Sequence, residues 1–262
     1  MASVAWNSPR AGVWRYGRRD ALLVALAGLH GLMLALWPAA PLIAVGVWWN
    51  SNTIAHNFIH RPFFRSVPIN RLFSAALSIL LGIPQRLWRD RHLAHHAGVS
   101  WRLRLSSQLA VETGLVLSLW AALAYVSPRF FLLTYAPGYL AGLVLCAAQG
   151  HWEHDGERAV SHYGRIYNWL FFNDGYHAEH HADPGIHWSE MPRRAKVGQA
   201  SACQSRLNLR ALELLERLVL RSPYLQDFVL RTHRRAFRAL LPRCDPSIAW
   251  QLSAADCFLA RR

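Results

Sequence analysis

Cysteine is scarce in this chain, and its scarcity excludes the commonest sulfur-based metal sites. Only four cysteines occur among 262 residues, and no two of them form a C-x-x-C pair. Paired cysteines at short spacing are the usual signature of structural zinc sites and of thiol redox centres. We therefore expect four free, reduced thiols: Cys146, Cys203, Cys244 and Cys257.

Lysine and the acidic residues are also few, so the chain is strongly basic through arginine. Lys196 is the single lysine among 29 basic residues, against 15 acidic ones, and the formal net charge is +14. Such a charge fits nucleic-acid binding or a surface that lies on anionic lipid. The long apolar runs favour lipid, so we expect no nucleic-acid partner. The preference for arginine over lysine also indicates a GC-rich bacterial genome.

Charged residues make up only 17% of the chain, whereas 53% of it is hydrophobic and gathers in long runs. Two pairs of runs, each separated by a proline-containing turn, cover 21–37 with 42–49 and 109–126 with 130–148. Eighteen apolar residues span about 27 Å as a helix, close to the thickness of a bilayer core. The pattern therefore predicts an all-α membrane protein with four transmembrane helices in two hairpins, rather than a soluble helical protein.

The remaining segments complete this topology. Residues 72–84 form an apolar run too short to cross a bilayer, which predicts a re-entrant or interfacial helix. Glu112, near the start of the second hairpin, is expected at the membrane interface. Arginines fill the N-terminal arm and the stretch from Arg61 to Arg104, whereas the two outer turns hold only Arg129. The positive-inside rule then predicts cytoplasmic N- and C-termini in a multi-pass protein, in a bacterial cytoplasmic membrane.

Composition divides the chain into three parts. Residues 1–20 form a cytoplasmic arm, 21–202 the membrane catalytic domain with its cytoplasmic helical part, and 203–262 a C-terminal region. In that last region Leu207, Ala211, Leu214 and Leu218 recur at helical spacing among Arg and Glu. This periodicity predicts an amphipathic helix that packs on the cytoplasmic side.

Histidines form three short motifs, which are the strongest chemical signal in the sequence. One H-x-x-x-H is followed by two copies of H-x-x-H-H. Residues three or four apart share a helix face, so each motif directs its imidazoles to one place. Two copies of H-x-x-H-H have a random probability of roughly 0.001 at this histidine content. We predict eight metal ligands: His56, His60, His92, His95, His96, His177, His180 and His181.

A ninth ligand is expected just after the last apolar run, where two histidines occur. His154 is the stronger candidate and His151 the alternative, with His162 behind both. His30 and His233 each stand alone in the sequence, so we expect them to be ordinary buried or surface side chains rather than metal ligands. His187 lies off the pattern of the third motif and is expected beside the ligands at most. Candidate acceptors for the imidazole N–H groups are Glu153, Asp155, Asp174 and Glu179.

The number of ligands indicates which metal is bound. A structural zinc ion takes four ligands, often cysteines, and eight or nine histidines exceed one such site. Two metals with several imidazoles each and open positions suit redox iron and O₂ chemistry. Soluble di-iron bundles use Glu with Glu-x-x-His, a pattern that is absent here. The sequence therefore predicts two non-haem Fe ions in a histidine-rich centre.

At this point the sequence resembles the membrane fatty acid desaturase and hydroxylase superfamily. The resemblance rests on HNFIH at 56–60, HLAHH at 92–96 and HAEHH at 177–181, and it covers residues 20 to about 190. The run Glu153-His154-Asp155-Gly156 is similar to an extra histidine motif of alkane hydroxylases and supports His154 as the ninth ligand. That motif often has Asn four residues earlier, where this chain has Gly150.

The resemblance implies an O₂-dependent oxidoreductase that uses two electrons to attack an unactivated C–H bond of a lipid or acyl chain. No HPGG haem motif is present, so a separate ferredoxin, rubredoxin or cytochrome would supply the electrons. Desaturation of a fatty acid or lipid is the leading hypothesis. A hydroxylase or ketolase acting on lipid, alkane or carotenoid is the second, and a non-enzymatic membrane metal-binding protein is the third.

Overall fold

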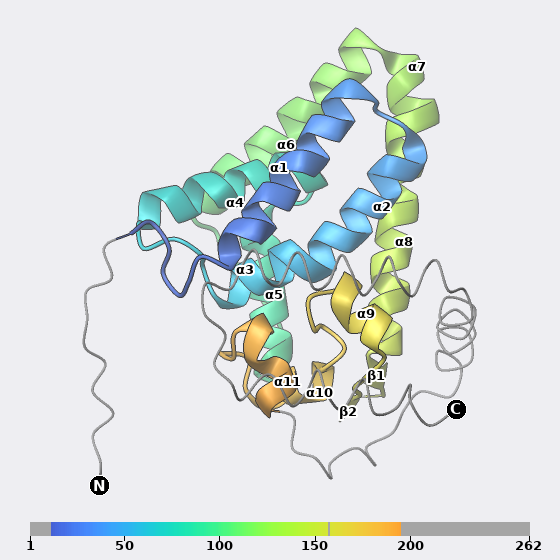
Figure 1. Cartoon of the computed structure of the whole chain (residues 1–262). Helices are drawn as coiled ribbons and strands as arrows, with labels where there is room; N and C mark the ends of the chain where they lie inside the picture. Colours follow the sequence, from blue (N-terminus) through green and yellow to red (C-terminus); the bar gives the residue numbers. More distant parts are fainter. Residues whose placement is uncertain (1–11, 157, 195–262) are drawn as a thin grey trace, which may run out of the picture. The chain divides into compact units, whose positions relative to one another are not determined.

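The computed structural model describes residues 12–156 and 158–194, and there the chain is almost entirely helical (Figure 1). The elements are α1 (Asp20–Leu36), α2 (Ala40–Asn50), the π-helical η1 (Ser51–Ala55), α3 (His56–His60), α4 (Val67–Leu81), α5 (Gln85–His96), α6 (Ser107–Val126), α7 (Pro128–Phe130), the π-helical η2 (Phe131–Tyr135), α8 (Ala136–Trp152), β1 (His154–Asp155), β2 (Arg158–Ala159), α9 (Arg165–Leu170), α10 (His177–Ala182), the 3-10 turn η3 (Trp188–Glu190) and α11 (Met191–Arg194). The predicted amphipathic region 203–262 lies outside the described residues, as do His233, Cys203, Cys244 and Cys257. Cys146 is a free thiol, as expected.

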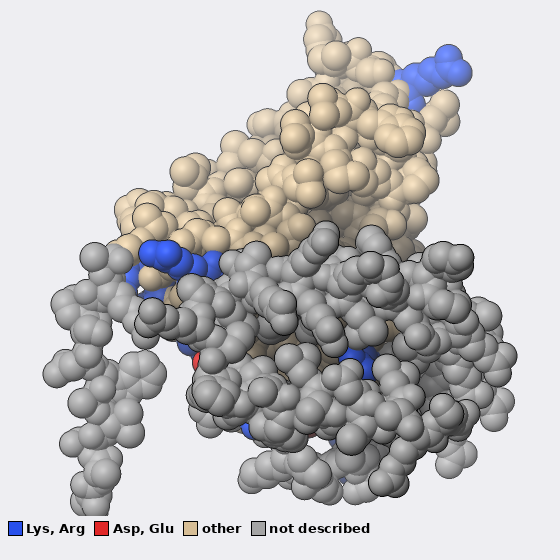
Figure 2. Space-filling view, viewed as in Figure 1, with Lys and Arg blue, Asp and Glu red and all other residues tan. Residues whose placement is uncertain are grey.

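Among the described residues, two helices are long and apolar enough to cross a membrane, Ser107–Val126 and Pro128–Trp152. They correspond to the predicted second hairpin, and the chain turns between them at Ser127. In the first hairpin α1 is a shorter apolar helix of 17 residues, and α2 passes into η1 after Asn50. Figure 2 shows that the part of the surface formed by these helices is nearly free of charged residues, while basic residues gather at its lower edge. The full topology of four spans stays a prediction.

Helices α4 and α5 form a bent pair rather than one helix. Their axes meet at 97° across a short break, in which Gly82 adopts a left-handed conformation with φ 64°. A residue with a side chain rarely adopts that conformation, so Gly82 suits the turn. The apolar run at 72–84 lies in α4 and this bend, consistent with the expected re-entrant or interfacial helix. From the bend α5 runs away from the apolar helices (Figure 1).

Helix α8 packs closely on α2 through a stripe of small residues. A methyl group added at Gly138 would lie 2.6 Å from the carbonyl oxygen of Ala40, and one at Gly142 would lie 2.7 Å from Cβ of Val47. Small residues four apart allow backbones to approach in this way, the usual means of packing apolar membrane helices. This contact fixes the helix that leads into the first histidine motif against the one that leads to His154.

Polar side chains line the end of α2 and the π-helical η1. Asn50, Asn52 and Thr53 each hydrogen-bond the backbone carbonyl four residues earlier, as does Asn57 in α3. A π-helical turn leaves backbone carbonyls imperfectly paired, and these side chains satisfy them. The helical chain therefore continues from Ala40 to His60 and carries His56 and His60 at its end.

His30 in α1 is buried against α2, in agreement with its interpretation as an ordinary buried or surface side chain rather than a metal ligand. Its Nδ1 lies 3.1 Å from Nδ2 of Asn50, and a methyl group added at Gly46 would overlap the imidazole at 1.8 Å from Nε2. We expect Gly46→Ala to destabilise the protein by about 1–3 kcal/mol, because the methyl group displaces the ring. Thermal unfolding in detergent measures this loss. His30→Ala in the same chain should recover most of it, and an equal loss in both backgrounds would contradict the contact.

Candidate metal centre

The structure brings all nine predicted histidine ligands together at one end of the helical hairpins. They come from four separate stretches of chain: α3, α5, the start of β1, and α10. Within residues 12–156 and 158–194, three sets of side chains place ligand atoms within 4.8 Å of one another: two sets of histidines, and one of Glu153, Asp174 and His177. Five histidines form what we call group A, namely His56, His60, His92, His96 and His180; three more form group B, namely His95, His154 and His181.

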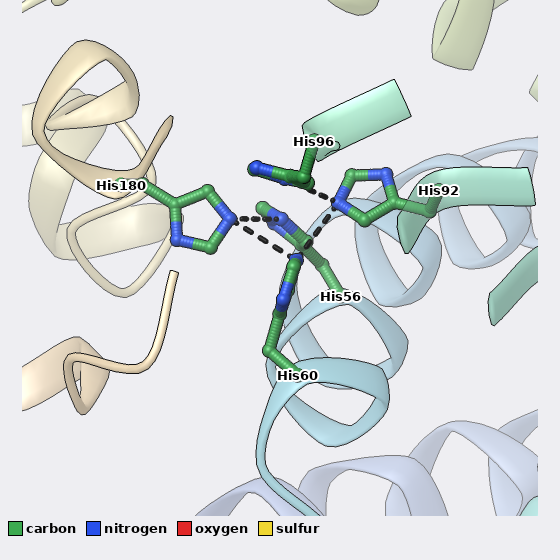
Figure 3. Close-up of side chains that lie close together, drawn as sticks. All are labelled: His56, His60, His92, His96 and His180. Carbon is green, nitrogen blue, oxygen red and sulfur yellow. Dashed lines mark hydrogen bonds between the residues drawn. The ribbon is translucent and has the colours of Figure 1, made fainter. Parts of the chain in front are cut away.

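In group A the imidazoles of three elements converge with their Nε2 atoms facing inward (Figure 3). The Nε2 atom of His180 lies 3.0 Å from Nε2 of His56 and 3.2 Å from Nε2 of His60. The Nε2 atom of His92 lies 2.9 Å from Nε2 of His60 and 3.0 Å from Nε2 of His96. Five lone-pair-bearing nitrogens therefore surround one small volume.

These spacings fit a metal ion. Two nitrogen ligands at right angles, each about 2.1 Å from a metal, lie about 3.0 Å apart. The four Nε2 to Nε2 distances of group A run from 2.9 to 3.2 Å. Two neutral imidazoles cannot both present lone pairs to each other favourably, whereas a shared cation would satisfy every one of them. The donor set is therefore suited to hold iron, zinc or copper.

Group B completes a second set beside the first. The Nε2 atom of His154 lies 3.1 Å from that of His95 and 3.3 Å from that of His181. His177 lies next to group B, with ring centroids 4.9 Å from His154 and 4.7 Å from His181, but its ligand atom lies in a set with Glu153 and Asp174. The two groups touch where His96 stacks on His181, with centroids 4.1 Å apart. Eight imidazoles thus divide five and three between two adjoining groups, and His177 is the ninth beside them.

Burial keeps these imidazoles neutral, which is the form that binds metal. Desolvation, reinforced by neighbouring imidazoles, lowers the pKa of His60 to about 2 and that of His96 to about 3. The same causes lower the pKa of His181 to about 4 and that of His177 well below its usual value. The lone pairs remain available at neutral pH.

Two acidic residues lie behind the ligands. Nδ1 of His56 donates to Oδ1 of Asp174 at 3.0 Å, whereas Nδ1 of His177 lies 3.8 Å from Oε2 of Glu153, beyond hydrogen-bond distance. The contact to Asp174 fixes the His56 tautomer that leaves Nε2 free for a metal. Burial raises the pKa of Asp174 to about 7 and that of Glu153 well above its usual value. Asp174 thus accepts from an imidazole as predicted, and Glu153 lies near one.

The other two predicted acceptors are Glu179 and Asp155. Glu179 accepts hydrogen bonds from Ser161 Oγ and Tyr163 OH, both at 2.6 Å, and its expected contact with an imidazole is not observed. Glu179 lies on the far side of the short helix α10 from the ligands, because its neighbours His177, His180 and His181 take the inner face. Asp155 lies in β1.

A buried amide that the sequence did not single out joins the two carboxylates. Nε2 of Gln149 donates to Glu153 Oε1 at 2.8 Å and to Asp174 Oδ2 at 3.0 Å, and it lies 3.0 Å from Tyr167 OH. Its Oε1 accepts from Trp48 Nε1 at 2.7 Å. Gln149 precedes Glu153 by one helical turn, and that spacing is the only signal the sequence held.

The candidates for the ninth ligand are separated clearly. His154 lies in group B, and its Nδ1 is 2.9 Å from the carbonyl oxygen of Gly150, so a backbone group orients it where the related motif often has Asn. His151 is exposed on α8 and belongs to neither group, and His162 also lies outside both groups. His187 contacts Asp20 at 2.9 Å and Ser189 at 2.8 Å, away from the ligands.

The loop before the third motif has an unusual backbone. Phe172 and Asn173 both have positive φ, at 51° and 65°, which is strained for a bulky residue such as Phe172. Asn173 Nδ2 donates to the carbonyl oxygen of Trp188 at 2.9 Å and holds the turn. The strain is stored next to Asp174 and therefore next to group A.

Comparison with known proteins agrees with this arrangement. The family model described as fatty acid desaturase matches residues 31–104 and 98–208, more than half of the chain. The sphingolipid delta(4)-desaturase/C4-monooxygenase of Bos taurus is 34% identical over 116 residues, which cover 41% of this chain and 33% of the bovine protein. The matched region thus spans about a third of that relative's length. No solved structure matches. Together with the three histidine motifs, the family match shows that this chain belongs to the fatty acid desaturase family.

Proposed function

We propose that this protein is a membrane-bound lipid desaturase that inserts a double bond into an acyl chain with O₂ and two electrons. The observation that carries the proposal is the convergence of nine histidines, eight of them in two adjoining groups, within a chain of this family. Iron bound in both groups would supply the O₂ activation that attack on an unactivated C–H bond requires. The ligands would be the nine histidines predicted from the sequence: the eight of groups A and B, and His177 beside group B.

The chain's own residues hold and orient this centre. Asp174 accepts from His56 and the carbonyl of Gly150 faces His154, so both imidazoles present Nε2 inward. A small hollow of about 20 Å³ lies beside group A at His56 and His180 and is lined further by Asp174, Phe172 and Trp188. Its volume is enough for about one water-sized molecule next to the imidazoles.

The membrane arrangement supports a lipid substrate. Most of the side chains in the two spanning helices face outward, with 17% and 11% of their apolar windows buried in the protein, as expected for contact with lipid. We propose four spans with the histidine centre on the cytoplasmic side, following the arginine distribution. Nearly all histidines lie outside the long apolar helices, which argues against a transport protein that would line its spans with metal ligands.

Hydroxylation is the second candidate outcome. The bovine relative is named as both a desaturase and a monooxygenase, so one protein of this type carries both activities in its name. A second removal of hydrogen yields an alkene, whereas transfer of oxygen yields an alcohol, and the same ligand set suits either. His95 of group B is exposed and provides a surface approach for a separate ferredoxin, rubredoxin or cytochrome.

Lipid analysis of an expressing host tests the proposal. We expect extracts to contain new lipids lighter by two hydrogens, which mass spectrometry detects as a loss of about 2 Da, while a host expressing His92→Ala lacks them. His92 contacts His60 and His96, so the variant loses group A while retaining the membrane helices. Lipids heavier by one oxygen would select the hydroxylase. Unchanged lipids in an iron-replete host with a suitable reductase would count against both.

A further inference from the structure

Glu112 is a carboxylate inside the helical body of the protein rather than at its surface. It lies in the second turn of α6, where the sequence predicts an interfacial position, but its side chain is 1% exposed. An ionisable group on a membrane helix is costly to bury and is retained where it has a specific partner. The partners of Glu112 belong to α4, to the start of α5 and to α6 itself.

Three donors saturate this carboxylate. Oε2 accepts from the backbone N–H of Arg86 at 2.6 Å, and Oε1 accepts from Ser74 Oγ at 2.6 Å and from Gln108 Nε2 at 3.0 Å. Every partner donates, which is the arrangement expected around an ionised carboxylate. The contact to Arg86 is made by the backbone, because the Arg86 guanidinium pairs with Asp90.

The N–H of Arg86 is one of the first-turn donors of α5 that have no acceptor within the helix itself. Residue Pro84 occupies the cap position of α5 and has no side chain able to accept a hydrogen bond, so the helix lacks a cap of its own. Ser78 Oγ takes the neighbouring N–H of Gln85 at 2.9 Å. Side chains of α4 and α6 therefore cap α5 from outside, and the negative carboxylate also suits the positive end of the helix dipole.

Helix α5 is the support for a third of the candidate ligands. Its second half carries His92 and His96 of group A and His95 of group B. The direction in which α5 leaves the bend therefore sets three imidazoles at once. Tyr139 of α8 holds the same bend through its OH, which donates to the carbonyl oxygen of Gly82 at 3.1 Å.

We propose that Glu112 is a positioning residue for the histidine centre: it caps α5 from α6 and thereby fixes the second histidine motif against the first and third. This inference rests on the proposed function only in treating the three histidines as ligands. Glu112 itself touches neither substrate nor metal. Its role is to couple a membrane helix to the site through one backbone hydrogen bond and the bend around it.

The test compares Glu112→Gln, Glu112→Asp and Glu112→Met in the full chain, with Ser74→Ala as the matched control. In Gln the amide oxygen can still reach the Arg86 N–H, whereas Asp keeps the charge but is one methylene too short, and Met has no acceptor. Ser74→Ala removes a partner of the carboxylate but leaves the bond to α5. Hydrogen exchange of peptides covering residues 85–96 in metal-free protein reports the cap without relying on activity.

We expect exchange over 85–96 to accelerate by about tenfold in the Asp and Met variants, with α8 unchanged and bound iron reduced to less than half. The Gln and Ser74→Ala variants should stay within about twofold of wild type. If the Met variant fails to fold, the comparison of the other two still tests the proposal, because residues 85–96 should exchange more slowly in the Gln variant than in the Asp variant. Wild-type exchange in Asp, or equal acceleration in Gln and Asp, would overturn the proposal. A normal exchange pattern in a chain that leaves lipids unchanged would refute the proposed function alone.

Discussion

Replacing His180 with alanine is expected to lower lipid oxidation by at least about 100-fold and to reduce bound iron from two ions to about one per chain. His180 belongs to the third motif and reaches the first, with its Nε2 3.0 Å from that of His56 and 3.2 Å from that of His60. Loss of its imidazole removes the ligand that joins α10 to α3 in group A. Iron analysis of the purified protein, together with lipid turnover, measures both effects.

His151→Ala is the matched control, because His151 is an exposed histidine of α8 that lies three residues from His154 and belongs to neither group. It should keep its iron and activity within about twofold of wild type, as surface changes usually do. If instead His151→Ala loses iron and His154→Ala retains it, the ninth ligand has been assigned to the wrong residue. If His180→Ala retains full activity, group A is not the reacting site.

Gly175→Ala is expected to destabilise the third motif by about 3 kcal/mol and to abolish activity with it. A methyl group there would lie 2.2 Å from the carbonyl oxygen of His162 and 2.7 Å from Oδ1 of Asn168. The backbone cannot easily give way, because the N–H of His162 donates to the carbonyl oxygen of Gly175 at 2.7 Å. Any shift of the backbone at Gly175 would also displace His177, which follows two residues later.

Thermal unfolding and iron content measure the effect of Gly175→Ala. Gly114→Ala serves as the control, because a methyl group at Gly114 in α6 would meet nothing within 4 Å. That variant should be as stable as wild type or slightly more so, since alanine favours a helix over glycine by about 1 kcal/mol. Equal behaviour of the two variants would show that the close contact around Gly175 is not what holds the third motif.

The convergence of the histidine motifs could be predicted from sequence because their information is local, and their role as metal ligands stays a prediction. Spacings of three and four residues place imidazoles on one helix face, and three such motifs on the same side of a set of apolar helices have one natural meeting place. His154 could be preferred over His151, and the structure places it in group B. The free thiol at Cys146, the turn between α6 and α8, and the role of Asp174 as an imidazole acceptor could be predicted from the same kind of reasoning.

The division of the histidines and the support behind them could not be predicted in this way. His95 and His96 are neighbours in sequence yet belong to different groups, because consecutive residues point 100° apart on a helix and only the packing of α3 and α10 decides what each meets. The sequence suggests only an interfacial position for Glu112, because its contact with the start of α5 depends on tertiary structure. Gln149 reads as one more residue of an apolar helix until two carboxylates approach it from Glu153 and Asp174. Each of these roles depends on tertiary contacts between distant segments.

The central claim is that this chain holds two metal ions in one histidine centre, and a count of iron tests it most directly. Full-length protein expressed with ⁵⁷Fe and purified in detergent should contain about two iron ions per chain, with a Mössbauer spectrum of high-spin, nitrogen-ligated iron. His60→Ala in group A and His95→Ala in group B should each lower the count towards one. A count near zero, or a single ion that both variants lose alike, would contradict the account.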